Sequence, residues 1–139
     1  MSQEHLAGLA LKRITSKDNP EFRRLLAVHG HSDVRRAEGL CWLEGPRLIQ
    51  QFLLAFKQAK EHPQAPFQWQ CDTLVFSEDW LQGQASQPLW QPLVEELSCL
   101  MTHALVMPDH LFARLAETSS PAGLGLLIAS GLAYDEPLV

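Results

Sequence analysis

Cysteine is scarce in this chain, and long apolar runs are missing. The chain has three cysteines, Cys41, Cys71 and Cys99. An odd and widely spaced set argues against a disulfide framework and favours a reducing, cytoplasmic setting. No apolar run reaches the roughly 18 residues of a membrane span, and the first residues do not have the pattern of a secretory signal. We therefore expect no membrane partner.

The motifs of common catalytic sites are also missing. Gly123 and Gly125 are not followed by the third glycine of a dinucleotide-binding loop, and the sequence has no Walker-type phosphate loop and no GxSxG elbow. His29 and His31 lack the further donors that a metal site needs, so surface histidines beside a helix end are the preferred interpretation. We predict no catalytic residue and no metal site.

Positive charge is confined to one part of the chain. The net charge is -5, yet residues 12–47 hold eight of the eleven Lys and Arg against five acidic residues. That window therefore carries +3 and the rest of the chain -8. Such a split can place one basic face on an acidic body, which suits a polyanion such as nucleic acid. The alternative is a set of solvated helix faces with no partner.

Helix and strand signals alternate over a length that suits a single domain. Asp18 or Asn19 can cap a helix in which Pro20 takes the first turn and Gly30 the stop. Further helices are expected over 48–56, 89–97 and 108–116, and strands over 40–43, 73–77, 104–107 and 123–130. Segments 61–72 and 78–87 are expected to be irregular. The alternation predicts an α/β sheet covered on both faces.

Three separated stretches occur in an order that resembles one family of RNA-modifying enzymes. They are ITSKDNPEFRRLL (Ile14–Leu26), Arg35 followed by GLCWLEGPRLI (Gly39–Ile49), and LFARLAETSSPAGLGLLIA (Leu111–Ala129). Together they resemble the N-terminal substrate-binding domain of the SpoU-type (TrmH-like) RNA ribose 2'-O-methyltransferases. The family turn often reads Pro-Gln-Gly, whereas this chain has Ala122 at the middle position.

The resemblance implies a three-layer α/β/α sandwich with a small central mixed sheet, similar to the kink-turn-binding ribosomal proteins. Residues 1–11 would be a flexible N-terminal extension, 12–131 the RNA substrate-binding domain, and 132–139 a linker to a C-terminal knotted methyltransferase domain that this chain lacks. S-adenosylmethionine would bind that second domain, so the chain alone is expected to carry no cofactor and no activity. The full-length enzyme would act on rRNA or tRNA as a homodimer.

The candidate RNA-binding residues lie in or beside the first two matched stretches. They are Lys12, Arg13, Lys17, Arg23, Arg35, Arg36, Glu44, Gly45 and Arg47. Arg35 is the first choice for a phosphate contact, because a guanidinium binds phosphate oxygens bidentately; a salt bridge to Asp33 or Glu38 is the equal alternative. Glu44 and Gly45 are candidates by analogy with the ribosomal relatives, against a simple capping and turn role.

The remaining candidates are the turn at the third stretch and the tryptophans. Thr118, Ser119 and Gly123 match the second family loop, where a packing role is equally open. Trp69 and Trp80 have polar neighbours and are expected to be exposed, but their acidic surroundings argue against an RNA platform. Two further functions stay open: a stand-alone RNA-binding protein of ribosomal type, and a protein-interaction domain without an RNA role.

Overall fold

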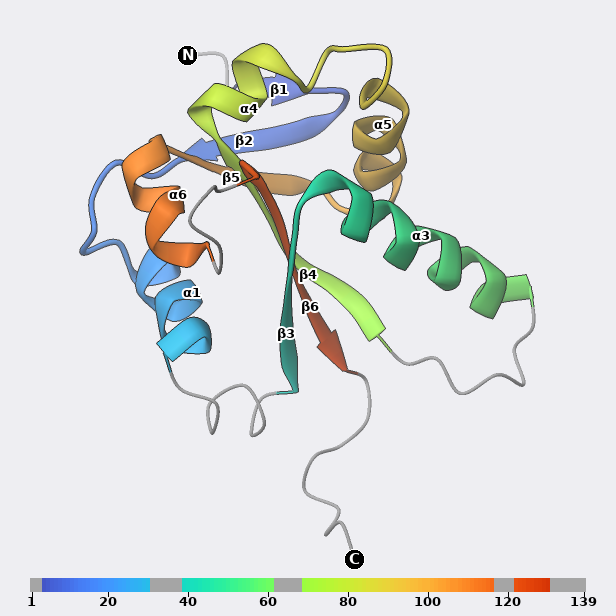
Figure 1. The fold of residues 1–139 in the computed structure, drawn as a ribbon, viewed down its shortest axis with the longest axis horizontal. Coiled ribbons are helices and arrows are strands. Elements are labelled where there is room, and N and C mark those ends of the chain that lie inside the picture. Colours follow the sequence, from blue (N-terminus) through green and yellow to red (C-terminus); the bar gives the residue numbers. More distant parts are fainter. Residues whose placement is uncertain (1–3, 31–38, 62–68, 117–121, 131–139) are drawn as a thin grey trace, which may run out of the picture.

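The computed structural model describes residues 4–30, 39–61, 69–116 and 122–130 (Figure 1). Its centre is a six-stranded mixed sheet in the order β1-β2-β5-β4-β6-β3. The strands are β1 (His5–Leu6), β2 (Leu9–Arg13), β3 (Leu40–Glu44), β4 (Trp69–Ser77), β5 (His103–Met107) and β6 (Leu124–Ser130). Strands β2, β5 and β4 pair in parallel, whereas β6 is antiparallel to both β4 and β3. None of the described helices is long and apolar enough to cross a membrane.

Helices cover both faces of this sheet, which confirms the predicted three-layer α/β/α class. They are α1 (Pro20–Gly30), α3 (Pro46–Glu61), α4 (Glu78–Gly83), α5 (Gln91–Leu100) and α6 (Asp109–Leu115). Helices α1 and α6 lie on one side of the sheet, and α3 and α5 lie on the other (Figure 1). Each side has its own buried apolar cluster, so the sheet separates two cores.

Aromatic side chains pack α1 and α6 against the sheet. Phe22 of α1 and Phe112 of α6 are fully buried, and Trp42 of β3 lies between the sheet and these helices. The centroids of the Trp42 and Phe112 rings are 6.3 Å apart. Helix α1 begins as its sequence predicts, since the Asn19 Oδ1 accepts the backbone N–H of Glu21 at 2.8 Å. This cap fixes the direction in which α1 leaves the sheet.

The N-terminal segment differs from its expectation as a flexible extension. Residues 5–13 form a hairpin of β1 and β2, and β1 is the outermost strand of the sheet on that side. Its turn places Ala7 and Gly8 at positive φ (52° and 95°), and Leu9 is fully buried. Strand β2 then pairs with β5 from Ala10 to Arg13. Leu9, Ala10 and Leu11 are all buried, so the strand lacks the alternation that sequence patterns recognise.

The segment after β4 also differs from its expectation. Residues 78–83 form the short helix α4, although their polar sequence predicted irregular structure. Ser77 caps this helix: its Oγ accepts the Trp80 N–H at 3.1 Å. Trp80 points into the core, and only 5% of the residue is exposed. Its ring stacks on the ring of Phe76, with 5.7 Å between the two centroids. The prediction of an exposed Trp80 is therefore wrong, because the helical turn reverses the direction of its side chain. Strand β4 also begins earlier than expected, at Trp69.

Gly125 offers a test of how tightly the sheet packs under α1 and α6. A Cβ on Gly125 would overlap the Trp42 ring. We expect Gly125→Ala to lower the free energy of unfolding by about 1–3 kcal/mol, because a buried ring must shift. Urea unfolding followed by circular dichroism measures this change. Gly83→Ala is the matched control, since a Cβ at Gly83 meets nothing within 4 Å; an equal loss in both variants would contradict the packing account.

Candidate nucleic-acid interface

Four strands end at one edge of the sheet, which we call the carboxyl edge. Strands β2, β5 and β4 are parallel, and β3 runs in their direction because both β3 and β4 are antiparallel to β6. The carboxyl edge therefore gathers Arg13, Glu44, Ser77 and Met107, and β6 begins there at Leu124. Ligands of open α/β sheets bind in the crevice at such an edge, so the loops at this edge are the first place to look for a site.

Two glycine turns join at the carboxyl edge through backbone hydrogen bonds. The Gly45 N–H donates to the Leu124 carbonyl at 2.8 Å, and the Ser77 N–H donates to the Gly123 carbonyl at 2.8 Å. Gly45 and Gly123 both have positive φ, 99° and 84°. A Cβ on Gly123 would lie 2.8 Å from both the Ser77 Oγ and the Trp80 Cβ. The geometry thus requires glycine at position 123 and brings together the two loops that the sequence singled out.

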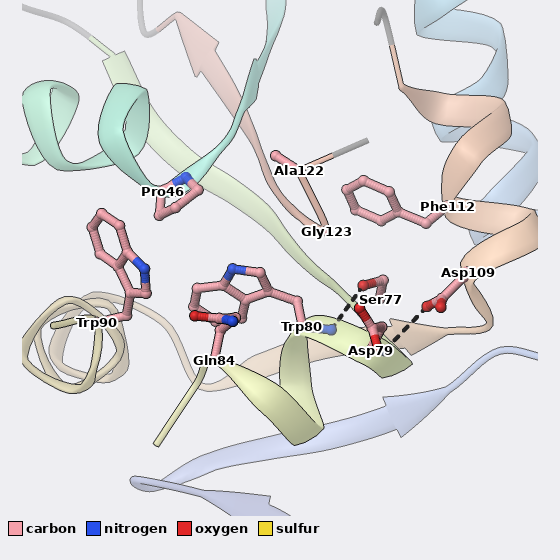
Figure 2. Close-up of a pocket in the computed structure, with 10 residues that line it drawn as sticks. All are labelled: Pro46, Ser77, Asp79, Trp80, Gln84, Trp90, Asp109, Phe112, Ala122 and Gly123. Atoms are coloured by element: carbon pink, nitrogen blue, oxygen red, sulfur yellow. Dashed lines mark hydrogen bonds between the residues drawn. The ribbon is translucent and has the colours of Figure 1, made fainter. Parts of the chain in front are cut away.

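A cavity of about 480 Å³ opens between these loops (Figure 2). It is lined by residues from the starts of α3, α5 and α6 and from α4 and its flanks: Pro46, Ser77, Asp79, Trp80, Gln84, Trp90, Asp109, Phe112, Ala122 and Gly123. Trp80 and Trp90 are almost fully buried and form an apolar floor. Phe112 and the carboxylates of Asp79 and Asp109 line the other end (Figure 2).

The charge of this cavity is negative. Asp109 Oδ1 accepts the backbone N–H of Asp79 at 3.1 Å, which holds the two carboxylate-bearing residues side by side. Such a pair repels phosphate. Arg47 is the cation nearest to the floor, with its guanidinium carbon 5.6 Å from the centroid of the Trp90 ring. The cavity therefore suits a planar or amino-bearing group rather than a phosphate.

The basic residues of β2 are neutralised by neighbouring carboxylates. Lys12 forms an ion pair with Glu21. Arg13 donates to both carboxylate oxygens of Glu4, at 2.6 and 2.8 Å, and also pairs with Glu78. The hydrogen bond from Arg13 lowers the pKa of the Glu4 carboxyl and, from the other side, raises the pKa of Arg13. Both cations are exposed but already have partners, so they are weaker candidates for RNA than their sequence suggested.

Lys17 and Arg23 lie in a second hollow, which we call the α1–α6 groove. This groove has a volume of about 760 Å³ and is lined by Lys17, Asp18, Arg23, Leu26, Ala27, His29 and Arg114. Sequence reasoning missed Arg114, because only the fold places α6 beside α1. The guanidinium carbon of Arg114 lies 5.7 Å from the centroid of the buried Phe22 ring. The basic candidates are thus divided between β2, this groove and the carboxyl edge.

Several predicted residues lie outside the described part of the chain. These are Arg35 and Arg36 with their possible partners Asp33 and Glu38, and also His31, Thr118 and Ser119. His29 is described and is half-buried: its Nδ1 lies 2.8 Å from the Leu25 carbonyl, so this nitrogen carries the hydrogen and donates. The described residues contain no group of three or more His, Cys, Asp or Glu placed to hold a metal ion.

Comparison with known proteins shows a likeness in fold. No protein-family model and no curated protein matches the chain in sequence. Among solved structures, the chain is similar to an rRNA methyltransferase from Sinorhizobium meliloti, alone and with AdoMet bound, with a TM-score of 0.61 and 15% identity. It is also similar to an RNA 2'-O ribose methyltransferase, with a TM-score of 0.62 and 20% identity. At these identities the likeness shows a shared α/β fold.

The likeness covers most of this chain and a minor part of each neighbour. The match spans 86% of this chain and 37% of the Sinorhizobium protein, and 92% of this chain and 40% of the 2'-O ribose methyltransferase. The chain therefore corresponds to less than half the length of the methyltransferases that it resembles.

Ser77 tests whether the α4 cap shapes the cavity. Ser77→Ala removes the acceptor of the Trp80 N–H and leaves a buried helix end without a partner. We expect a loss of about 1 kcal/mol in the free energy of unfolding and a change in tryptophan emission, since Trp80 is the floor of the cavity. Ser98→Ala is the control, because that hydroxyl donates to the Glu95 carbonyl of its own helix, α5, and caps no helix end. An unchanged free energy of unfolding in Ser77→Ala would show that this cap does not stabilise α4.

Proposed function

We propose that the chain is the RNA substrate-binding domain of an S-adenosylmethionine-dependent RNA ribose 2'-O-methyltransferase. The observation that carries the proposal is the fold likeness, which covers 86–92% of the chain and relates it to two RNA methyltransferases. The three sequence stretches that resemble the SpoU-type family give independent support. The substrate would be rRNA or tRNA, and the site of action cytoplasmic.

The catalytic step is assigned to a second domain. The chain spans about 40% of its structural neighbours, one of which has AdoMet bound. The acidic cavity at the carboxyl edge has no dinucleotide-type glycine loop, and its two aspartates border a floor of tryptophans. We infer that methyl transfer and dimerisation belong to a C-terminal knotted domain, while this domain holds the RNA for it.

The carboxyl edge supplies one proposed RNA contact. Gly45 has a positive φ, is buried and donates its N–H to the Leu124 carbonyl, so it sets the turn that precedes α3. The N–H groups of the first turn of α3 are the ones that a phosphate could approach here. Glu44 lies beside it and is half-buried, with one oxygen 3.4 Å from the Trp42 indole nitrogen. Arg47 is exposed and stacked on Trp90, which orients its guanidinium at the rim of the cavity.

A protein-interaction domain is the second candidate, and one observation favours it. Three large apolar side chains are strongly exposed on the α3 and α5 side: Leu48 at 44%, Leu54 at 58% and Leu89 at 63%. If these side chains form one contiguous apolar patch, that patch would suit a protein contact. They fit the methyltransferase proposal as well, because a catalytic domain of the same polypeptide is also a protein partner.

Titration with RNA and with S-adenosylmethionine separates these functions. We expect the 139-residue chain to bind structured ribosomal RNA fragments at low salt in fluorescence anisotropy. The slope of log affinity against log salt should change by about -0.7 to -0.9 per phosphate ion pair. Calorimetry with S-adenosylmethionine should give no binding heat. Tight binding of S-adenosylmethionine would contradict the division between domains, and failure to bind RNA at low salt would favour the interaction domain.

A further inference from the structure

The described basic side chains fall into two groups by their partners. Lys12, Arg13, Arg24 and Lys57 each pair with a carboxylate. Within the residues that the structure describes, four cations have no carboxylate partner: Lys17, Arg23, Arg47 and Arg114. Three of these four line the α1–α6 groove. Unneutralised cations that gather in one hollow attract an anion more strongly than the same charges spread over a surface.

The cations of the groove come from three separate segments. Lys17 precedes α1, Arg23 lies on α1, and Arg114 lies in the last turn of α6. Among the described residues that line the groove, Asp18 is the one carboxylate, set against the three cations. Ala27 and Leu26 of α1 contribute apolar side chains to the same lining.

Arg114 is oriented before any ligand arrives. Its guanidinium stacks over Phe22, which is fully buried and fixed in the core. A cation–π contact with a buried ring restricts the positions that the guanidinium can take and leaves its N–H groups available as donors. That geometry suits two parallel hydrogen bonds to a pair of phosphate oxygens. The groove therefore has the features of a phosphate site.

The acidic cavity at the carboxyl edge and the basic α1–α6 groove share one helix. Asp109 and Phe112 of α6 line the acidic cavity, and Arg114 of the same helix lines the basic groove. Asp109 lies in the first turn of α6 and Arg114 in the last, about 7.5 Å apart along the helix axis. The carboxylate of Asp109 and the guanidinium of Arg114 thus lie at opposite ends of α6, so a polyanion is attracted to one end and repelled at the other.

We propose that the α1–α6 groove binds phosphate groups of the RNA backbone, with Arg23, Arg114 and Lys17 as ligands. This inference deepens the proposed function and rests on it. It assigns a role to Arg114, and it removes Lys12 and Arg13 from the phosphate contact because their charges are already paired. It also places the RNA on the α1 and α6 side of the sheet, away from the exposed leucines of α3.

Removing one positive charge at a time, on either side of the sheet, tests whether the groove binds RNA. Arg23→Ala and Arg114→Ala each remove one positive charge, and Lys57→Ala on α3 is the control with the same change in net charge. The probe is a fluorescein-labelled RNA stem-loop with a single-stranded end, titrated by anisotropy at several KCl concentrations. We expect each groove variant to bind about 5- to 10-fold more weakly at low salt and to lose about 0.7–0.9 from the salt slope. The control should stay within about twofold.

The outcomes separate the groove from the proposed function. RNA binding by the unmodified chain together with equal affinities for Arg23→Ala, Arg114→Ala and Lys57→Ala overturns the groove and leaves the function standing. Absence of RNA binding by the unmodified chain overturns both. Polyglutamate that displaces RNA equally well at equal charge identifies an acidic protein as the ligand, which also overturns the proposal.

Arg114→Ala also removes the packing of Arg114 on Phe22, so a conservative variant is needed as a control. Arg114→Lys keeps the charge but loses the planar fork, so its affinity should lie between those of the unmodified chain and Arg114→Ala. Thermal unfolding of each variant shows whether it is folded. If Arg114→Ala does not fold, Arg23→Ala and Arg114→Lys decide the result.

Discussion

The close approach of Gly123 to the end of β4 organises the functional side of the molecule. Its carbonyl accepts the Ser77 N–H, and its α-carbon lies so near Ser77 and Trp80 that no side chain fits there. The next residue, Leu124, accepts the Gly45 N–H. Through these bonds the ends of β3 and β4 and the start of β6 are locked together. The orientation of α4, the cavity above Trp80 and the direction in which α3 leaves the sheet all follow from this junction.

Positive and negative charges are unevenly distributed over the surface around this junction. Carboxylates neutralise Lys12 and Arg13 near the ends of β2, and a pair of aspartates makes the carboxyl-edge cavity acidic. Three of the four described cations that lack a carboxylate partner, Lys17, Arg23 and Arg114, line the groove between α1 and α6. The local charge of a hollow, more than the net charge of a sequence window, therefore indicates where a polyanion is held. The chain is acidic overall, yet its described residues form a basic groove between α1 and α6.

Much of the fold followed from sequence, and the exceptions have physical causes. The Asn19 cap and the apolar runs of β3 and β6 predicted their elements closely, because local signals determine them. The β1–β2 hairpin was missed because Leu9 is buried by a parallel partner far along the chain, and α4 because one cap at Ser77 decides it. The same applies to the site. Lys17 and Arg23 are RNA-binding candidates from the sequence, whereas Arg114 is placed beside them only through the packing of α6 on α1.

Amide hydrogen exchange with and without bound RNA tests the central claim most directly, since it maps the contacted side of the sheet without altering any residue. The account predicts slower exchange in α1, in α6 and at the turn between β3 and α3 when RNA is bound. Exchange along the outer face of α3 and in α5 should be unchanged. Protection confined to α3 and α5, with α1 and α6 unaffected, would contradict it.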